Sequence, residues 1–183
     1  SEAAGLKQPS LEFIWPALEA RALPDAMFKD HELVRLVGVL GIGEASRGAG
    51  TLDPDFVRLL QAMATDPSPA VRRAVAVALR LISAGALTVN KTSPAASGPR
   101  VALQPLLDPL LRASAVSPDL TLPFLIWQAL ENRLATEAPT YVPWLAALAP
   151  QTKPLSAGLT YKTMRRLCAT RTPDNIDLAL EFL

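Results

Sequence analysis

The fold prediction for this chain starts from DPSPAVRRAVAVALRLI, residues 66–82. This stretch begins as a turn followed by a helix start, because the Ser68 hydroxyl can accept a hydrogen bond from a free backbone amide and Pro69 fits the first helical turn. Apolar residues then recur at steps of three and four, which places them on one helix face. These residues are Val71, Ala74, Val75, Ala78, Leu79 and Ile82. The stretch therefore predicts an amphipathic helix with a capped N-terminus.

A second helix is predicted immediately upstream of this one. Asp53, Pro54 and Asp55 form the same kind of helix start, and apolar residues follow along one side. These residues are Phe56, Val57, Leu59, Leu60 and Met63. Two capped helices joined by a Pro-rich turn are expected to pack as one antiparallel hairpin.

The composition agrees with a chain of many short helices. Half of the 183 residues are hydrophobic but only 5% are aromatic, and Ala and Leu carry most of the apolar content, which favours closely packed helices over a sheet. The 17 prolines fit this picture because most of them stand at expected helix starts. We expect residues 1–183 to form a single domain cut from a longer protein, because the apolar end of the chain carries no helix stop signal.

Internal repetition indicates how the helices are arranged. Val34-Arg35 and Val71-Arg72 are 37 positions apart, and each pair follows an aspartate, Asp30 or Asp66. A repeat of roughly 30–50 residues made of two helices is typical of an α-solenoid, in which each unit buries its apolar side against its neighbours. The first copy, residues 30–43, predicts a helix closed by two glycines, Gly41 and Gly43. Its inward residues are expected to be Leu33, Val34, Val37, Leu40 and Ile42.

The rest of the chain continues the helical pattern. Residues 83–100, SAGALTVNKTSPAASGPR, predict a flexible loop between repeats. Further helices are expected at residues 11–23, 101–115, 122–135, 140–148 and 161–169, and after Thr172-Pro173-Asp174. The predicted fold class is all-α, an α-solenoid of about four helical hairpins plus a terminal helix.

The repeated segment resembles a known repeat. D-x-x-P-x-V-R-x-x-x-A-x-A-L, which begins at Asp66 and ends at Leu79, is similar to the second helix of a HEAT repeat. Together with LDPLL at residues 107–111 and LPFLIWQALE at residues 122–131, it resembles the helical-repeat segment of haem-binding membrane-bound dehydrogenase proteins of the planctomycete type. Those proteins combine a β-propeller, HEAT-like repeats and a C-terminal cytochrome c domain. The similarity extends from residue 30 to residue 182 and includes an arginine-rich helix at residues 164–167.

The resemblance implies a role without catalysis for this part of such a protein. The family holds its haem on a Cys-x-x-Cys-His motif, whereas this chain has one cysteine, Cys168, and one histidine, His31. The resemblance therefore implies no cofactor in this chain, a parent protein with redox activity, and a location in the periplasm or cell envelope.

Arg35 and Arg72 hold equivalent places in two repeats. In one interpretation they form a structural ladder, in which each guanidinium bonds an aspartate or free carbonyl groups in the turn of a neighbouring repeat. In the other they bind an anion or a phosphate. We favour the structural ladder, with Asp30 and Asp66 as the acidic members.

A surface for a partner is expected on the stacked second helices, which line the concave side of a solenoid. Its expected polar groups are Arg73, Arg80, Arg133, Arg165 and Arg166. The predicted function is therefore a non-catalytic scaffold that binds a protein partner or a neighbouring domain. No apolar run reaches the roughly 18–20 residues that cross a bilayer, so direct membrane insertion is not expected.

The alternative is a nucleic-acid-binding repeat protein such as a HEAT-like DNA glycosylase. That function needs a basic groove, an aromatic cradle and a carboxylate that face one another. Trp15, Trp127 and Trp144 are candidates for the cradle, although the apolar neighbours of Trp127 favour core packing. The balanced charge, 18 basic and 17 acidic residues, disfavours this function. A chaperone for cofactor attachment also uses HEAT-like repeats, but no residue in the sequence favours that function.

The remaining candidates for chemistry have structural interpretations. His31 lies in a first helical turn, where a solvated position is expected, and Cys168 on an apolar helix is expected to be a small buried residue. The acidic residues near helix starts serve helix N-termini rather than forming a catalytic pair. They are Asp53, Asp55, Asp174 and Asp177.

Overall fold

Helices make up all the regular structure in the part of the chain that the computed structural model describes, residues 31–84, 101–116, 119–152 and 155–181. They are α3 (Glu32–Ala45), α4 (Pro54–Ala64), α5 (Pro69–Ala84), α6 (Gln104–Ala115), α7 (Leu122–Leu148), the short 3-10 helix η2 (Ala149–Gln151), α8 (Leu155–Thr170) and α9 (Pro173–Glu181). The predicted all-α class is confirmed. The predicted helix at residues 11–23, Asp30 and loop residues 85–100 lie outside the described ranges.

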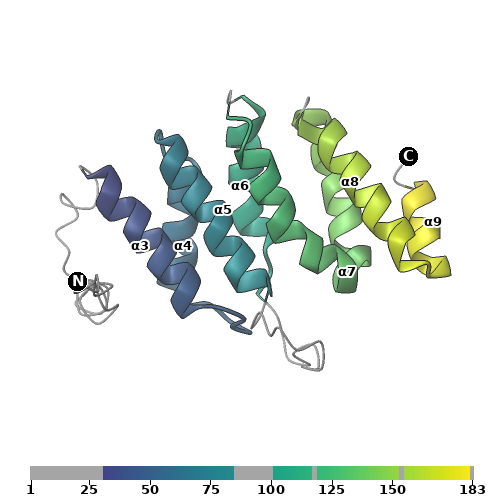
Figure 1. Cartoon of the computed structure of the whole chain (residues 1–183), viewed down its shortest axis with the longest axis horizontal. Helices are drawn as coiled ribbons and strands as arrows, with labels where there is room; N and C mark the ends of the chain where they lie inside the picture. Colours follow the sequence, from purple (N-terminus) through teal and green to yellow (C-terminus); the bar gives the residue numbers. More distant parts are fainter. Residues whose placement is uncertain (1–30, 85–100, 117–118, 153–154, 182–183) are drawn as a thin grey trace, which may run out of the picture.

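The helices form two layers (Figure 1). The front layer, nearer the viewer, contains α3, α5, the first part of α7 and α8, and the back layer contains α4, α6, the second part of α7 and α9. Within each layer, helices that are two apart in the sequence pack together, as α3 does on α5, α5 on α7 and α4 on α6. These contacts join neighbouring helices within each layer.

The two predicted helix starts at α4 and α5 are confirmed. The Asp53 carboxylate accepts a hydrogen bond from the Asp55 amide at 2.8 Å. The Ser68 hydroxyl accepts from the Ala70 amide at 3.2 Å and from the Val71 amide at 3.4 Å. Side-chain oxygens in these positions satisfy amides that have no partner inside the helix.

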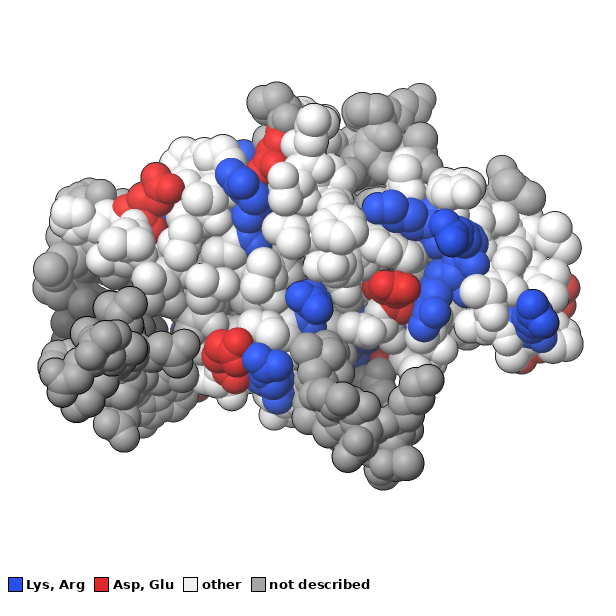
Figure 2. All heavy atoms as spheres, viewed as in Figure 1, with Lys and Arg blue, Asp and Glu red and all other residues white. Residues whose placement is uncertain are grey.

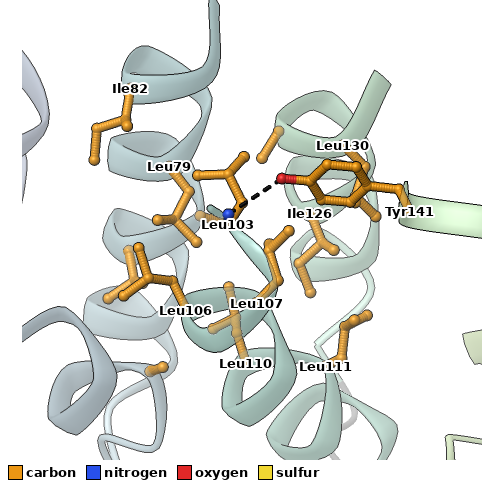
Figure 3. Close-up of a cluster of buried hydrophobic side chains, with 14 of the residues drawn as sticks. Leu79, Ile82, Leu103, Leu106, Leu107, Leu110, Leu111, Ile126, Leu130 and Tyr141 are labelled. Atoms are coloured by element: carbon orange, nitrogen blue, oxygen red, sulfur yellow. Dashed lines mark hydrogen bonds between the residues drawn. The ribbon is translucent and has the colours of Figure 1, made fainter. Parts of the chain in front are cut away.

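The hydrophobic core fills the space between the two layers and the contacts between neighbouring helices of each layer. All six residues of the predicted apolar face of α5 are buried. Figure 3 shows leucines of α6 lying between α5 and the first part of α7. The buried side chains in this region include Leu79, Ile82, Leu106, Leu107, Leu110, Ile126 and Leu130. Burial of such side chains is the main favourable contribution to folding.

The prediction that Gly41 and Gly43 close α3 is wrong. The helix continues to Ala45, and both glycines are buried inside it. A Cβ on Gly43 would lie 2.7 Å from the Ala78 Cα, so the absence of a side chain allows α3 to approach α5 closely. Leu33, predicted to point inward, is 71% exposed, because it stands about two and a half turns before Ile42 and therefore on the opposite side of the helix.

The prediction of two helices at residues 122–135 and 140–148 is confirmed, because the α7 range contains two helices that meet at a kink at Glu137 (φ −132°, ψ 29°). Pro139, just past the break, has no amide to donate to the carbonyl four residues earlier. In α6, Pro109 leaves the Pro105 carbonyl without a helical donor in the same way, and the Gln61 side chain of α4 donates to it at 3.2 Å.

Three helix boundaries differ from the predicted ones. Residues 83 and 84, expected in the loop, belong to α5, and Ser83 is buried. The helix expected from residue 101 begins at Gln104, and the helix expected from residue 161 begins at Leu155. Leu103 is the N-cap residue of α6, and its amide donates a hydrogen bond to the Tyr141 hydroxyl at 3.1 Å.

Candidate binding surface

Arg35 of α3 and Asp66 of the α4–α5 turn form a two-point ion pair. The Arg35 Nε lies 2.7 Å from Asp66 Oδ2, and Nη2 lies 3.3 Å from Oδ1. Both side chains are largely buried, with 11% and 3% of their areas exposed. The Asp66 carboxylate also accepts from the Ser68 amide at 2.8 Å. The ion pair therefore joins α3 to the turn that starts α5.

Arg72 contacts the same turn from its other side. Its Nη1 donates to the Asp66 carbonyl at 2.6 Å and to the Pro67 carbonyl at 3.0 Å. Arg35 and Arg72, which occupy equivalent sequence positions, thus converge on Asp66, one through the carboxylate and the other through the backbone. Asp30, the remaining member of the predicted ladder, lies outside the described residues.

Arg133 is wrongly predicted to lie on the interaction surface. Only 1% of the residue is exposed, its Nη1 lies 2.8 Å from Glu137 Oε1, and its Nη2 donates to the Val101 carbonyl at 3.1 Å. Arg133 stands seven residues after Ile126 and three after Leu130, both of which are buried, so helical spacing alone places it on the core face. That spacing is the signal that the prediction overlooked.

The other predicted surface arginines lie on two separate helices of the front layer. Arg73 is exposed on α5 and lies 3.3 Å from Asp119, which precedes α7, and Arg80 is partly exposed on the same helix. Arg165 is exposed and Arg166 partly exposed on α8. The structure brings Arg165 and Arg166 together, whereas α7 separates them from the α5 pair (Figure 1).

Lys162 joins Arg165 and Arg166 on one side of α8, although sequence reasoning missed it. The three cations are spaced at three and four residues, and α8 contains no Asp or Glu. Figure 2 shows blue side chains gathered over α8, with one red group beside them. Lys162 stands three residues before Arg165 and four before Arg166, and this helical spacing is the sequence signal that identifies it.

Two aromatic rings of α7 contact one of these cations, Lys162. The Lys162 Nζ lies 5.4 Å from the centre of the Phe124 ring and 5.9 Å from that of Trp127, both within the range of a cation–π interaction. Phe124 is 50% exposed. Trp127, expected in the core, is only partly buried and packs against the outside of the hydrophobic core. We call Lys162, Arg165, Arg166, Phe124 and Trp127 the α8 basic surface.

The α8 cations differ from most other arginines in their partners. Most arginines in the described ranges bond a carboxylate or a backbone carbonyl; they are Arg35, Arg47, Arg58, Arg72, Arg73, Arg112 and Arg133. Lys162, Arg165 and Arg166 form no salt bridge with any described residue. Charges without an internal ion pair are the ones that remain for a partner.

Trp144, the other described tryptophan, lies away from this surface. Its ring packs edge-on against Tyr141, with the ring centres 6.1 Å apart and the planes at 89°. This geometry is typical of core aromatic pairs. Trp15 lies outside the described residues, so the structure brings no cradle of three tryptophans together within the described ranges.

The remaining candidates for catalysis or metal binding form no cluster of functional side chains among the described residues. His31 is exposed just before α3, and Asp55 forms an exposed ion pair with Arg58. Cys168 is exposed, and its predicted burial is wrong because it follows the buried Leu167 and so points about 100° away around the helix. Among the described residues, no group of three or more His, Cys, Asp or Glu side chains could hold a metal ion.

A hollow between α6, α7 and α8 is too small for a substrate. Leu111, Leu145, Leu159 and Thr152 contribute to its lining, and its volume of about 10 Å³ leaves room for about one water molecule. Across the described ranges, none of the helices has the combined length and apolar character that crossing a bilayer requires. Comparisons of the chain with protein-family models, curated proteins and solved structures found no match.

Proposed function

We propose that this chain is a HEAT-like α-solenoid that acts by binding another protein or a neighbouring domain. Helices two apart in the sequence pack within each layer, as successive units of a solenoid do. The Arg35–Asp66 ion pair joins one unit to the next, which is the place that a structural ladder would occupy. Both features support a stacked-repeat architecture whose layers present broad faces.

The observation that carries the binding role is the group of cations on α8, which form no ion pair with any residue that the structure describes. Most of the other described arginines bond a carboxylate or a carbonyl, whereas Arg165 is exposed and Arg166 partly exposed. Both share a side of α8 with Lys162, which lies over two aromatic rings. Arginine and aromatic residues contribute most to binding in protein interfaces. The α8 basic surface therefore has the composition of a protein-binding site.

We also propose that the parent protein is a haem-binding redox protein that contains a cytochrome c domain. The support is the resemblance of residues 66–82 and 122–131 to the repeat segment of planctomycete-type membrane-bound dehydrogenases. In such a protein the natural partners are the β-propeller and the cytochrome c domain. The repeat domain then acts as the scaffold that holds them.

Isothermal titration calorimetry tests this function. The whole chain is titrated with the separately produced cytochrome c and β-propeller domains of a dehydrogenase of this type. We expect saturable heat with at least one domain and weaker binding when Arg165 and Arg166 are both changed to glutamate. No saturable heat with either domain at about 0.1 mM protein would overturn the proposal.

A further inference from the structure

Building on the proposed binding role, we infer that the α8 basic surface docks an acidic peptide segment of its partner, a segment rich in Asp and Glu. The inference rests on three features of the described residues: the charge of α8, the geometry of the cation–π contacts, and the position of Glu131.

The charge of α8 favours carboxylate ligands. Lys162, Arg165 and Arg166 share one side of the helix, and α8 carries no acidic residue. Helix-dipole stabilisation does not account for the two arginines, because its effect is confined to the last turn and α8 has no basic residue there. A planar guanidinium presents a fork of donors that matches the two oxygens of a carboxylate.

The cation–π contacts fix the position of Lys162 and leave Arg165 and Arg166 available to bind carboxylates. The Lys162 ammonium lies over both the Phe124 and Trp127 rings, so its position is defined by two contacts. Phe124 keeps half of its area exposed next to these charges. An acidic segment can therefore place its carboxylates on the arginines and an apolar side chain against Phe124.

A peptide fits this surface better than a nucleic acid does. Non-specific binding of single-stranded nucleic acid relies on bases stacked on aromatic rings, and Lys162 already contacts both rings. Glu131 follows Trp127 by four residues and so shares its side of α7, where its charge opposes a continuous run of phosphates. Separate carboxylates on a peptide can avoid Glu131.

Fluorescence anisotropy with a fluorescein-labelled peptide of ten glutamates tests the inference. We expect saturable binding that weakens about tenfold in the variant R165E/R166E, and that also weakens as salt rises from about 50 mM to about 300 mM. The matched control is R47E/R58E, which makes the same change in net charge at exposed arginines, Arg47 in the turn after α3 and Arg58 on α4. We expect less than about a twofold change in the control.

An NMR measurement on the unaltered protein makes the test independent of the variants. The indole NH signal of Trp127, assigned with W127F, should shift when the glutamate peptide is added, while the signal of Trp144 should not. A peptide of ten lysines should shift neither signal.

Three results would overturn the inference. They are an absence of binding by the glutamate peptide, equal weakening in R165E/R166E and R47E/R58E, and tighter binding of a labelled ten-nucleotide oligothymidylate than of the peptide. If the cytochrome c or propeller domain still binds when the glutamate peptide does not, only the acidic-segment inference fails. If none of them binds, the proposed function fails with it.

Discussion

The Arg133 guanidinium bonds the Glu137 carboxylate at 2.8 Å, and Glu137 is the residue at which α7 breaks. The second arm of the same guanidinium holds the Val101 carbonyl, on the segment that leads into α6. One buried cation therefore connects the break in α7 to the segment before α6.

Replacement of Arg133 should destabilise the fold. In R133M the Val101 carbonyl and the Glu137 carboxylate lose a charged donor, and we expect the free energy of unfolding to fall by about 2–4 kcal/mol. Urea denaturation followed by circular dichroism measures this change. The control R165M removes a charge from the exposed face of α8 and should change stability by less than about 0.5 kcal/mol. Equal stability of R133M and the original protein would contradict the buried role of Arg133.

Tyr141 should support the same segment through its hydroxyl. The oxygen accepts a hydrogen bond from the Leu103 amide at 3.1 Å in a buried position (Figure 3). Y141F leaves that amide without a partner, and we expect a loss of about 1–3 kcal/mol at neutral pH. Y161F, at an exposed tyrosine, is the control and should have little effect. Thermal or urea unfolding of both variants provides the comparison.

Alkaline pH should lower the free energy of unfolding, in part through ionisation of Tyr141. Burial is the largest influence on this group and raises the pKa of Tyr141, while the Leu103 hydrogen bond and the charge of Arg133 lower it. A raised folded pKa gives stability that is fully present below the unfolded pKa of about 10 and is lost as pH rises through the folded value. Above pH 10 we expect the free energy of unfolding to fall more steeply in the original protein than in Y141F. Parallel curves would show that Tyr141 does not contribute.

The close approach of α3 and α5 should make Gly43 intolerant of a side chain. In G43A the new Cβ would lie 2.7 Å from the Ala78 Cα and 2.8 Å from its Cβ, so the two helices must separate. We expect a loss of about 1–3 kcal/mol, although alanine favours a helix by about 1 kcal/mol. G158A is the matched control in α8, where nothing lies within 4 Å of the new Cβ, and it should gain up to about 1 kcal/mol. A stabilised G43A would show that the helices are not in contact there.

The buried ion pair between Arg35 and Asp66 should matter more than an exposed one. R35A leaves the buried Asp66 carboxylate without its cation, and we expect a loss of about 1.5–3 kcal/mol in urea unfolding. R47A removes an exposed pair with Glu44 three residues away and should cost less than about 1 kcal/mol. Similar losses in both variants would indicate that Arg35 does not join α3 to the turn.

The local features of this protein could be predicted from its sequence. The Asp53 and Ser68 helix starts and the buried face of α5 depend on residues within about four positions of each other, so capping chemistry and helical spacing predict them. The all-α class follows from the same patterns repeated along the chain. The core position of Arg133 could also have been read from its spacing after Ile126 and Leu130.

The contacts between helices could not be predicted in this way. Arg35 reaches Asp66 across 31 positions, Gln61 reaches the Pro105 carbonyl across 44, and Gly43 meets Ala78 in the neighbouring helix. Lys162 joins the rings of Phe124 and Trp127 in the same way. These contacts depend on how far one helix is displaced and rotated against another, and that geometry results from the packing of whole helix faces. For this reason the sequence predicted helices and charges, while the packed layers determined which charges hold the fold and which remain on its surface.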